Sequence, residues 1–295
     1  MSVTLSSSGG APRLQRSWDS RAAGNFIGGG AGTGLLVAAA AALIAGRPYF
    51  LAGILAIAQI GFGLSMVWLE IGRPLRALNV FFHPQTSWMS REALLALPLL
   101  AFAAAAVIAD QNVVPLPPEL RQLAAPFALT AAVLAFGFLF CQARMLKASQ
   151  GIPAWREPAL QPVILVTGLA EGIGLLLLLT VVTGPPPAWA VPAAIVALLA
   201  RAATWEHYRQ RLQAHAPAPA IAALDRISIP VHALGHALPA VLLLTALLVP
   251  APVILTAVAG LALAASGAWL KFAIVTRAAY TQGFSIPFAP VRGRK

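Results

Sequence analysis

The chain has 295 residues, of which 59% are hydrophobic and only 10% are charged. Globular proteins carry about a quarter charged residues, and disordered chains are poor in hydrophobic ones, so both classes are excluded. The 20 basic residues outnumber the 9 acidic ones and give a net charge of +11. They lie in short groups between long apolar runs, not in the single patch that nucleic-acid binding needs. The one cysteine, Cys141, supports neither a disulfide scaffold nor an iron–sulfur cluster in this chain.

Long apolar runs follow a polar N-terminal tail, residues 1–21, which lacks the apolar core of a removable signal peptide. A membrane core of about 30 Å needs about 20 apolar residues per helix. Eight stretches fit this length: residues 24–45, 50–69, 93–110, 123–145, 160–183, 188–206, 230–249 and 252–276. They are apolar on every face, whereas barrel strands alternate. The sequence therefore predicts an all-α membrane protein, with eight transmembrane helices within residues 22–276 and a basic C-terminal tail at 277–295.

The basic residues predict the orientation, because Lys and Arg collect in cytoplasmic loops. Eighteen of the 20, with Arg201 and Lys271 counted among them, fall on the side of both termini and of the connections after the second, fourth and sixth stretches. The opposite side has Arg47 and Arg121. We therefore expect a multi-pass protein of the cytoplasmic (inner) membrane with both termini in the cytoplasm. Its longest connections would face the cytoplasm too.

Glycines crowd the start of the first stretch, at residues 24–34. They resemble a dinucleotide-binding loop only superficially, because that loop needs a preceding strand and a βαβ unit. Small residues at this spacing favour close packing of membrane helices. Asn25 has two interpretations: its amide hydrogen-bonds a carbonyl ligand near the interface, or it caps the helix.

The connection between the second and third stretches is the densest polar segment. Glu70, His83 and Glu92 lie at one membrane face and are able to exchange protons with a buried redox ligand. The alternative is an interfacial loop in which Ser87 or Ser90 caps the third helix.

Few ionisable residues lie deep in the predicted helices. Glu171 falls near the middle of the fifth stretch and is either a proton-relay group or a neutral packing residue. His232 and His236 are four residues apart and share one helix face, so they cannot ligate one haem from opposite sides. A bis-His haem would need a partner such as His207. We expect no haem in this chain.

Three segments resemble membrane anchors of known oxidoreductases. Residues 65–77 (SMVWLEIGRPLRA), followed by 87–92 (SWMSRE), resemble the membrane anchor of dimethyl sulfoxide reductase. Residues 151–158 (GIPAWREP) are a second match, and 22–30 (AAGNFIGGG) resemble the related polysulfide-reductase anchors. The resemblance covers mainly residues 18–180.

This resemblance implies eight helices, no haem, and two partners: an iron–sulfur subunit and a molybdopterin catalytic subunit. The partners would hold the iron–sulfur clusters and the molybdopterin, and this chain would bind a quinone, either ubiquinone or menaquinone. Basic and aromatic side chains of the cytoplasmic connections would dock the iron–sulfur subunit. These docking candidates are Arg73, Arg76, Trp88, Arg91, Trp155 and Arg156.

The resemblance also assigns the quinone site. Glu92 matches a family carboxylate associated with quinone function, while Glu70 replaces a histidine that the family has nearby. We expect the quinone near Asn25, Glu70, His83 and Glu92, with Glu171 as a further candidate for quinone binding or proton transfer.

Two questions stay open. Residues 17–34 and 144–172 most resemble the anchor of phenylacetyl-CoA:acceptor oxidoreductases, which implies oxidation of a CoA ester. An anchor of a sulfite-oxidising or other sulfur-compound oxidoreductase would satisfy the same orientation. A proton-coupled secondary transporter using Glu171 and the two histidines is the alternative from another class, although the two halves show no convincing similarity.

Overall fold

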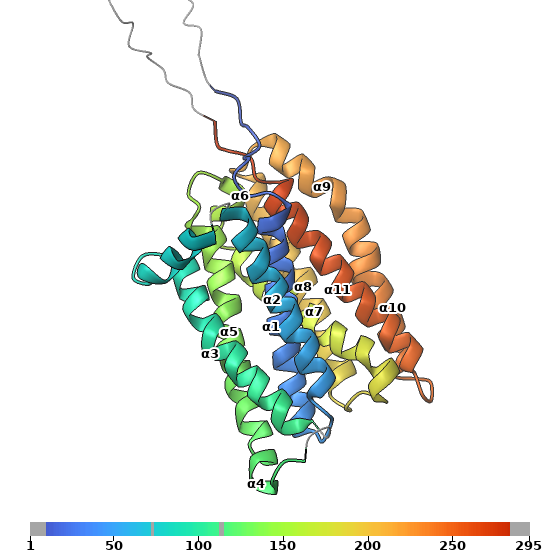
Figure 1. Cartoon of the computed structure of the whole chain (residues 1–295). Helices are drawn as coiled ribbons and strands as arrows, with labels where there is room; N and C mark the ends of the chain where they lie inside the picture. The colour runs from blue at the N-terminus through green and yellow to red at the C-terminus, as the bar shows by residue number, and fades with distance from the viewer. Residues whose placement is uncertain (1–9, 72–73, 112–114, 284–295) are drawn as a thin grey trace, which may run out of the picture.

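The computed structural model describes residues 10–71, 74–111 and 115–283. These residues form a bundle of long helices that run roughly side by side (Figure 1). In chain order the helices are α1 (Ser20–Ile44), α2 (Phe50–Ile71), the 3-10 helix η1 (Pro74–Phe82), α3 (Trp88–Asp110), α4 (Pro118–Arg121), α5 (Ala124–Ala148), α6 (Pro153–Arg156), α7 (Leu160–Thr183), α8 (Ala190–Gln213), α9 (Ala218–His232), the π-helix η2 (Ala233–Ala237), α10 (Leu238–Ala246) and α11 (Val253–Thr276).

Seven helical stretches within the described ranges are long and apolar enough to cross a membrane. They are Ser20–Ile44, Phe50–Ile71, Trp88–Asp110, Pro118–Ala148, Leu160–Thr183, Ala218–Ala246 and Val253–Thr276. The chain is therefore an all-helical, multi-pass membrane protein. The remaining predicted stretch, 188–206, coincides with α8, which is 24 residues long but carries Arg201, Glu206 and Arg209. Eight crossings stay a prediction.

The helix α1 lies inside the bundle, with α2, α5, α7 and α11 packed around it (Figure 1). Its glycines allow this, because a Cβ atom on Gly34 would collide with the backbone of Gly168 in α7. A Cβ atom on Gly32 would likewise meet Ile60 of α2. The prediction that the glycines serve close helix packing is confirmed.

The segment between the predicted stretches 188–206 and 230–249 is mostly helical in the structure. The helix α8 continues to Gln213 and α9 begins at Ala218, so only residues 214–217 connect them. A membrane stretch predicted from hydropathy stops at the first charged residues. A helix can continue through such residues, because its backbone hydrogen bonds do not depend on apolar side chains.

Both ends of the described chain meet at one end of the bundle (Figure 1). Leu14 pairs with Tyr280 in an isolated antiparallel bridge. The helix α1 then begins after Asp19, whose carboxylate accepts a hydrogen bond from the backbone N–H of Arg21 at 2.8 Å. Hydrogen bonds from Arg21 lower the pKa of Asp19. Because Asp19 is the cap, the interpretation of Asn25 as a helix cap is wrong.

Candidate functional site

An apolar cavity of about 390 Å³ lies between α2, η1 and α3. Its walls include Trp68 of α2, Phe81 of η1 and Leu97 of α3. Glu92 is the one ionisable residue among the described residues that line it. The cavity therefore offers apolar walls and a single carboxyl group.

Glu92 is held in the second turn of α3. Ser87 caps this helix by accepting a hydrogen bond from the backbone N–H of Ser90 at 3.2 Å. Glu92 is only 3% exposed, and its Oε1 accepts a hydrogen bond from Nδ2 of Asn25 at 3.4 Å. The other amide atom, Asn25 Oδ1, is buried without a partner in the part of the chain that the structure describes. The site thus has a buried carboxyl group and, beside it, an amide oxygen that is free to accept a hydrogen bond.

Gln142 of α5 completes this polar group. Its Nε2 donates to the backbone carbonyl of Asn25 at 3.0 Å, and the side chain is fully buried. A Cβ atom on Gly29 would lie 2.4 Å from Nε2 of Gln142, so the glycine leaves room for this amide beside α1. Sequence reasoning missed Gln142, although a glutamine inside a predicted apolar stretch was visible.

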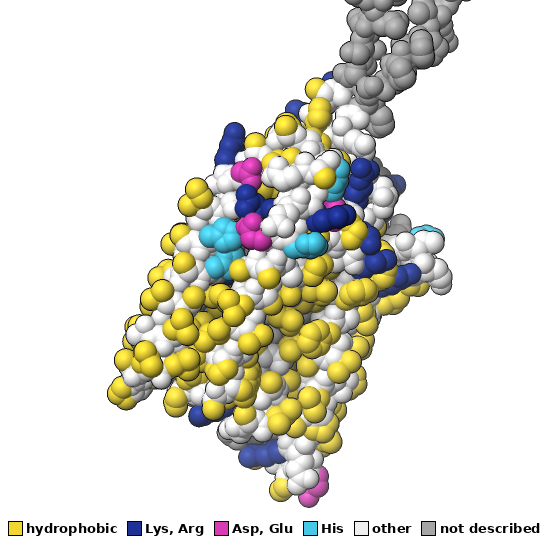
Figure 2. Space-filling model, turned by 180° about the vertical axis from the view of Figure 1, so that it is seen from behind, with side chains coloured by type: hydrophobic (Ala, Val, Ile, Leu, Met, Phe, Trp, Pro, Cys, Tyr) yellow, Lys and Arg dark blue, Asp and Glu magenta, His cyan; other side chains and the backbone are white. Residues whose placement is uncertain are grey.

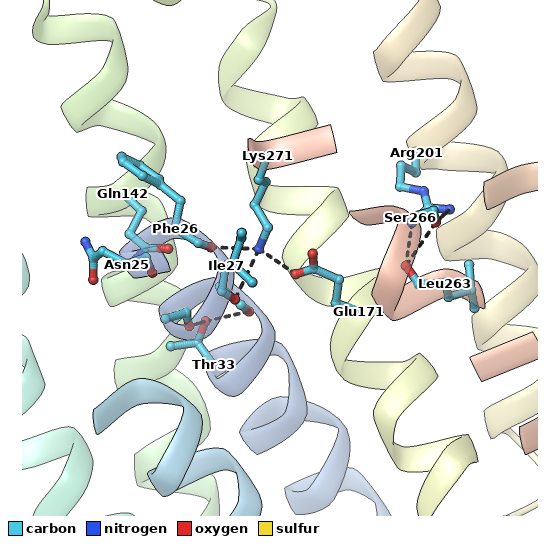
Figure 3. A network of polar contacts seen from close by, with 12 residues as sticks. Asn25, Phe26, Ile27, Thr33, Gln142, Glu171, Arg201, Leu263, Ser266 and Lys271 are labelled. Carbon is cyan, nitrogen blue, oxygen red and sulfur yellow. Dashed lines mark hydrogen bonds and ion pairs between the residues drawn. The ribbon is translucent and has the colours of Figure 1, made fainter. Parts of the chain in front are cut away.

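A second buried group joins α7, α11 and α1 (Figure 3). Lys271 Nζ lies 2.5 Å from Oε2 of Glu171, and both side chains are fully buried. The same ammonium donates to the carbonyl of Phe26 at 2.7 Å. A Cβ atom on Gly30 would lie 2.5 Å from Lys271 Nζ, so this glycine also admits a polar side chain. The α1 glycines therefore serve packing and also let polar groups approach the helix backbone.

Two buried basic residues correct the count of cytoplasmic charges. Lys271 and Arg201 were counted as cytoplasmic loop charges, yet their side chains are 0% and 1% exposed. Both residues lie within predicted membrane stretches, and this position in the sequence already indicated an interior location. Two of the eighteen basic residues therefore make interior contacts and do not indicate the orientation of the chain in the membrane.

Arg201 of α8 joins the π-helix η2 to α11. Figure 3 shows its contacts with Leu263 and Ser266 of α11. Its guanidinium donates to the carbonyl of Leu263 at 2.9 Å, to Ser266 Oγ at 3.1 Å and to the carbonyl of Gly235 in η2. A π-helix frees carbonyl groups from the regular ladder, and a guanidinium offers five donors for them. We read Arg201 as a structural residue.

The two histidines lie beside this group. His236 Nε2 is 3.4 Å from Nε of Arg201, and the rings of His232 and His236 are 5.1 Å apart. His232 contacts Glu206 at 2.7 Å. Figure 2 shows histidine and charged side chains gathered toward one end of this face, beside a broad hydrophobic surface.

The structure brings together two of the four residues predicted for the quinone site. Asn25 and Glu92 are in contact, whereas Glu70 is partly buried near Arg21 and does not line the cavity. His83 is exposed in the connection after η1. Glu171 belongs to the separate ion pair.

The predicted docking residues differ in exposure. Arg73 lies outside the described residues, Arg76 is exposed, and Arg156 is partly buried with a contact to the carbonyl of Gln150 at 3.3 Å. The ring of Trp88 lies under Arg91, whose guanidinium carbon is 4.1 Å from the ring centroid. These side chains are at or near the surface.

Trp155 is different. Its side chain is 2% exposed and its Nε1 donates to the carbonyl of Ile274 at 2.9 Å. The ring also lies against Trp18, with centroids 5.0 Å apart. The indole therefore joins α6 to α11 inside the protein, and the docking role of Trp155 stays a prediction.

One comparison with known proteins identifies the family. The family model described as polysulphide reductase, NrfD, matches residues 13–187, more than half of the chain. The chain therefore belongs to this family. Membership suggests a membrane anchor subunit of a sulfur or molybdopterin oxidoreductase, and members generally partner with iron–sulfur and molybdopterin subunits. No curated protein matches the chain. The matched residues end before α8, so Arg201 and Lys271 lie outside them.

Proposed function

We propose that this member of the polysulphide reductase NrfD family is a quinone-binding anchor that passes electrons to the membrane. The electrons would leave a molybdopterin catalytic subunit and reach the quinone through an iron–sulfur subunit. Both partners are of the kinds that family members generally have. The chain itself would supply the binding site and the protons.

The observation that supports this most directly is the apolar cavity with one buried carboxyl group. Its volume of about 390 Å³ lies within the range of about 300–1,000 Å³ typical of small-molecule sites. A quinone ring and its tail need apolar walls, and its carbonyl groups need hydrogen-bond donors. Trp68 and Phe81 supply such walls, and Glu92 supplies a donor when it is protonated.

Glu92 would hold and transfer a proton in this site. A bound quinone takes up two electrons and two protons when it becomes quinol. Glu92 is buried and has side-chain amide partners, Asn25 and Gln142, which orient its carboxyl group without adding a charge. General acids at such positions speed proton transfer by roughly 10²–10⁴-fold.

Glu171 would belong to the supply of protons and not to the quinone contact. It does not line the cavity, but its partner Lys271 contacts α1 at Phe26, next to Asn25. Glu171 Oε1 is buried without a partner in the described part of the chain, so it has room for a proton.

Eight crossings with both ends in the cytoplasm fit the described chain. Its two ends meet through Leu14 and Tyr280, which supports an even number of crossings. The helix α8 packs against α7 and supplies the eighth. Together with the positive-inside rule, this supports our proposal that the cavity end, the docking residues and the partners lie at the cytoplasmic face of the inner membrane.

The substrate depends on which catalytic subunit the chain binds. A cytoplasmic face suits phenylacetyl-CoA oxidation, because CoA esters are cytoplasmic, and it equally suits a sulfite-oxidising relative. Purification of the intact complex and identification of its subunits separates these from a solitary proton-coupled transporter, for which no iron–sulfur or molybdopterin subunit would co-purify.

Filling the cavity tests the site. Ala93 lines it, so Ala93→Phe should reduce the quinone that co-purifies with the complex about tenfold while subunit assembly stays normal. The matched control is Ala101→Phe, at an exposed position of the same helix outside the cavity. Equal quinone content in both variants would show that the quinone binds elsewhere.

A further inference from the structure

A second cavity lies between α9 and α11, at the end of the bundle where the described chain begins and ends. Its volume is about 460 Å³. Leu14 and Tyr280, which pair with each other, form part of its wall. The residues of α9 and α11 lie outside the segment that the family model matches.

Two basic residues line this cavity, one in the middle of α9 and one directly after the end of α11. Arg226 of α9 and Arg277, directly after α11, both line it, and none of the described lining residues is acidic. The neighbouring carboxylate of Asp225 is occupied by Arg209 at 2.6 Å. Arg226 has no carboxylate partner within the described ranges. Two guanidinium groups therefore face one cavity without a counter-charge.

The same cavity becomes apolar toward the middle of the bundle. Trp269 and Phe272 of α11 and Ile227 of α9 line it. Trp269 precedes Arg277 by eight residues, which corresponds to about 12 Å along a helix. A molecule that fills this cavity must combine an anionic group with an apolar part of about that length.

The surrounding surface shows where such a molecule comes from. Ile229 of α9 is 81% exposed and Leu261 of α11 is 52% exposed, as expected for side chains that face lipid tails. Both helices belong to stretches apolar enough to cross a membrane. Trp269, which lines the cavity, is itself 39% exposed, so the apolar wall opens onto this surface.

We propose that this groove binds an anionic phospholipid. Its phosphate lies between Arg226 and Arg277, and an acyl chain lies along Trp269 and Phe272. Anionic lipids are attracted to basic groups at the cytoplasmic leaflet, and basic pockets between transmembrane helices bind their head groups. Guanidinium groups suit phosphate because they offer paired donors. The proposal does not depend on the quinone site, since no residue is shared between the two cavities.

Lipid retention by the purified complex tests the proposal. Detergent-washed complex would be titrated with phosphatidylglycerol or with phosphatidylcholine, and bound lipid counted by native mass spectrometry. The natural protein should retain phosphatidylglycerol at least tenfold better than phosphatidylcholine. The double variant Arg226→Gln/Arg277→Gln should lose this preference. Ala223→Trp, which fills the groove and keeps both arginines, should lose it as well.

The control is Arg47→Gln/Lys147→Gln, which removes the same charge at residues that line neither cavity and should keep the preference. Loss of the preference in the control would mean general charge attraction and would overturn the proposal. Retention by Ala223→Trp would overturn it too, because the apolar groove would then be irrelevant. If the arginine variant kept its lipid but lost a partner subunit, Arg226 and Arg277 would be protein-docking residues.

Discussion

The early helices surround a buried acid with neutral groups, whereas the late helices surround buried cations with oxygen atoms. Glu92 of α3 has the amide of Asn25 beside it and faces a cavity. Lys271 of α11 has a carboxylate and a backbone carbonyl at hydrogen-bond distance. Arg201 of α8 has two carbonyls and a hydroxyl. Buried cations that have several hydrogen-bond acceptors hold helices together, while a buried acid with uncharged partners beside a cavity is available for chemistry.

The largest effect should come from breaking the ion pair of the late helices. Lys271→Met leaves the Glu171 carboxylate buried without its cation and should lower the free energy of unfolding by about 3–5 kcal/mol. Thermal denaturation in detergent measures this. The partly exposed Lys147 provides the control, and Lys147→Met should change stability little. Adding Glu171→Leu to Lys271→Met should restore most of the stability, but quinol formation should stay slow if Glu171 transfers protons.

The acid of the early helices should affect activity more than stability. Glu92→Gln keeps the shape and the contact with Asn25 but removes the proton, so quinol formation should fall about 100-fold with normal assembly. Activity of the intact complex in membranes is the measurement. Glu119→Gln, at an exposed position of α4 at the opposite end of the bundle, is the matched control (Figure 1). Full activity of Glu92→Gln would remove Glu92 from the mechanism.

The contact between the two sets of helices should tolerate no added methyl group. Gly34→Ala places a carbon against the backbone of Gly168 and should cost about 1–3 kcal/mol of stability. Gly61→Ala is the control, because a Cβ atom there meets nothing within 4 Å. Equal melting temperatures for the two variants would contradict the close approach of α1 and α7.

The smallest effect should distinguish the two tryptophans among the predicted docking residues. Trp155→Phe removes the hydrogen bond to Ile274 and should cost about 1 kcal/mol of stability without weakening subunit assembly. Trp88→Leu removes the ring under Arg91 and should weaken assembly with little loss of stability. Subunit retention on a gel-filtration column together with melting temperatures distinguishes them. The reverse pattern would support a docking role for Trp155.

The site was predictable where local sequence carries the chemistry. Glu92 and Asn25 were expected near one another because each lies close to the same membrane face. Glu70 and His83 shared that face but not the cavity, because position along the membrane normal does not decide which way a side chain points. Gln142 escaped prediction, since a polar residue in an apolar stretch reveals its partner only when helices pack.

Composition and hydropathy alone determined that this is a helical membrane protein, and they placed most helix centres, because lipid accepts only segments that satisfy their own backbone hydrogen bonds. The tertiary structure decided which of the basic residues are loop charges and which are interior ones. Glu171 and Lys271 are separated by 100 residues in the chain, yet their charged atoms lie 2.5 Å apart. Such a pairing depends on how α1, α7 and α11 pack together, and no pattern within one helix contains that information.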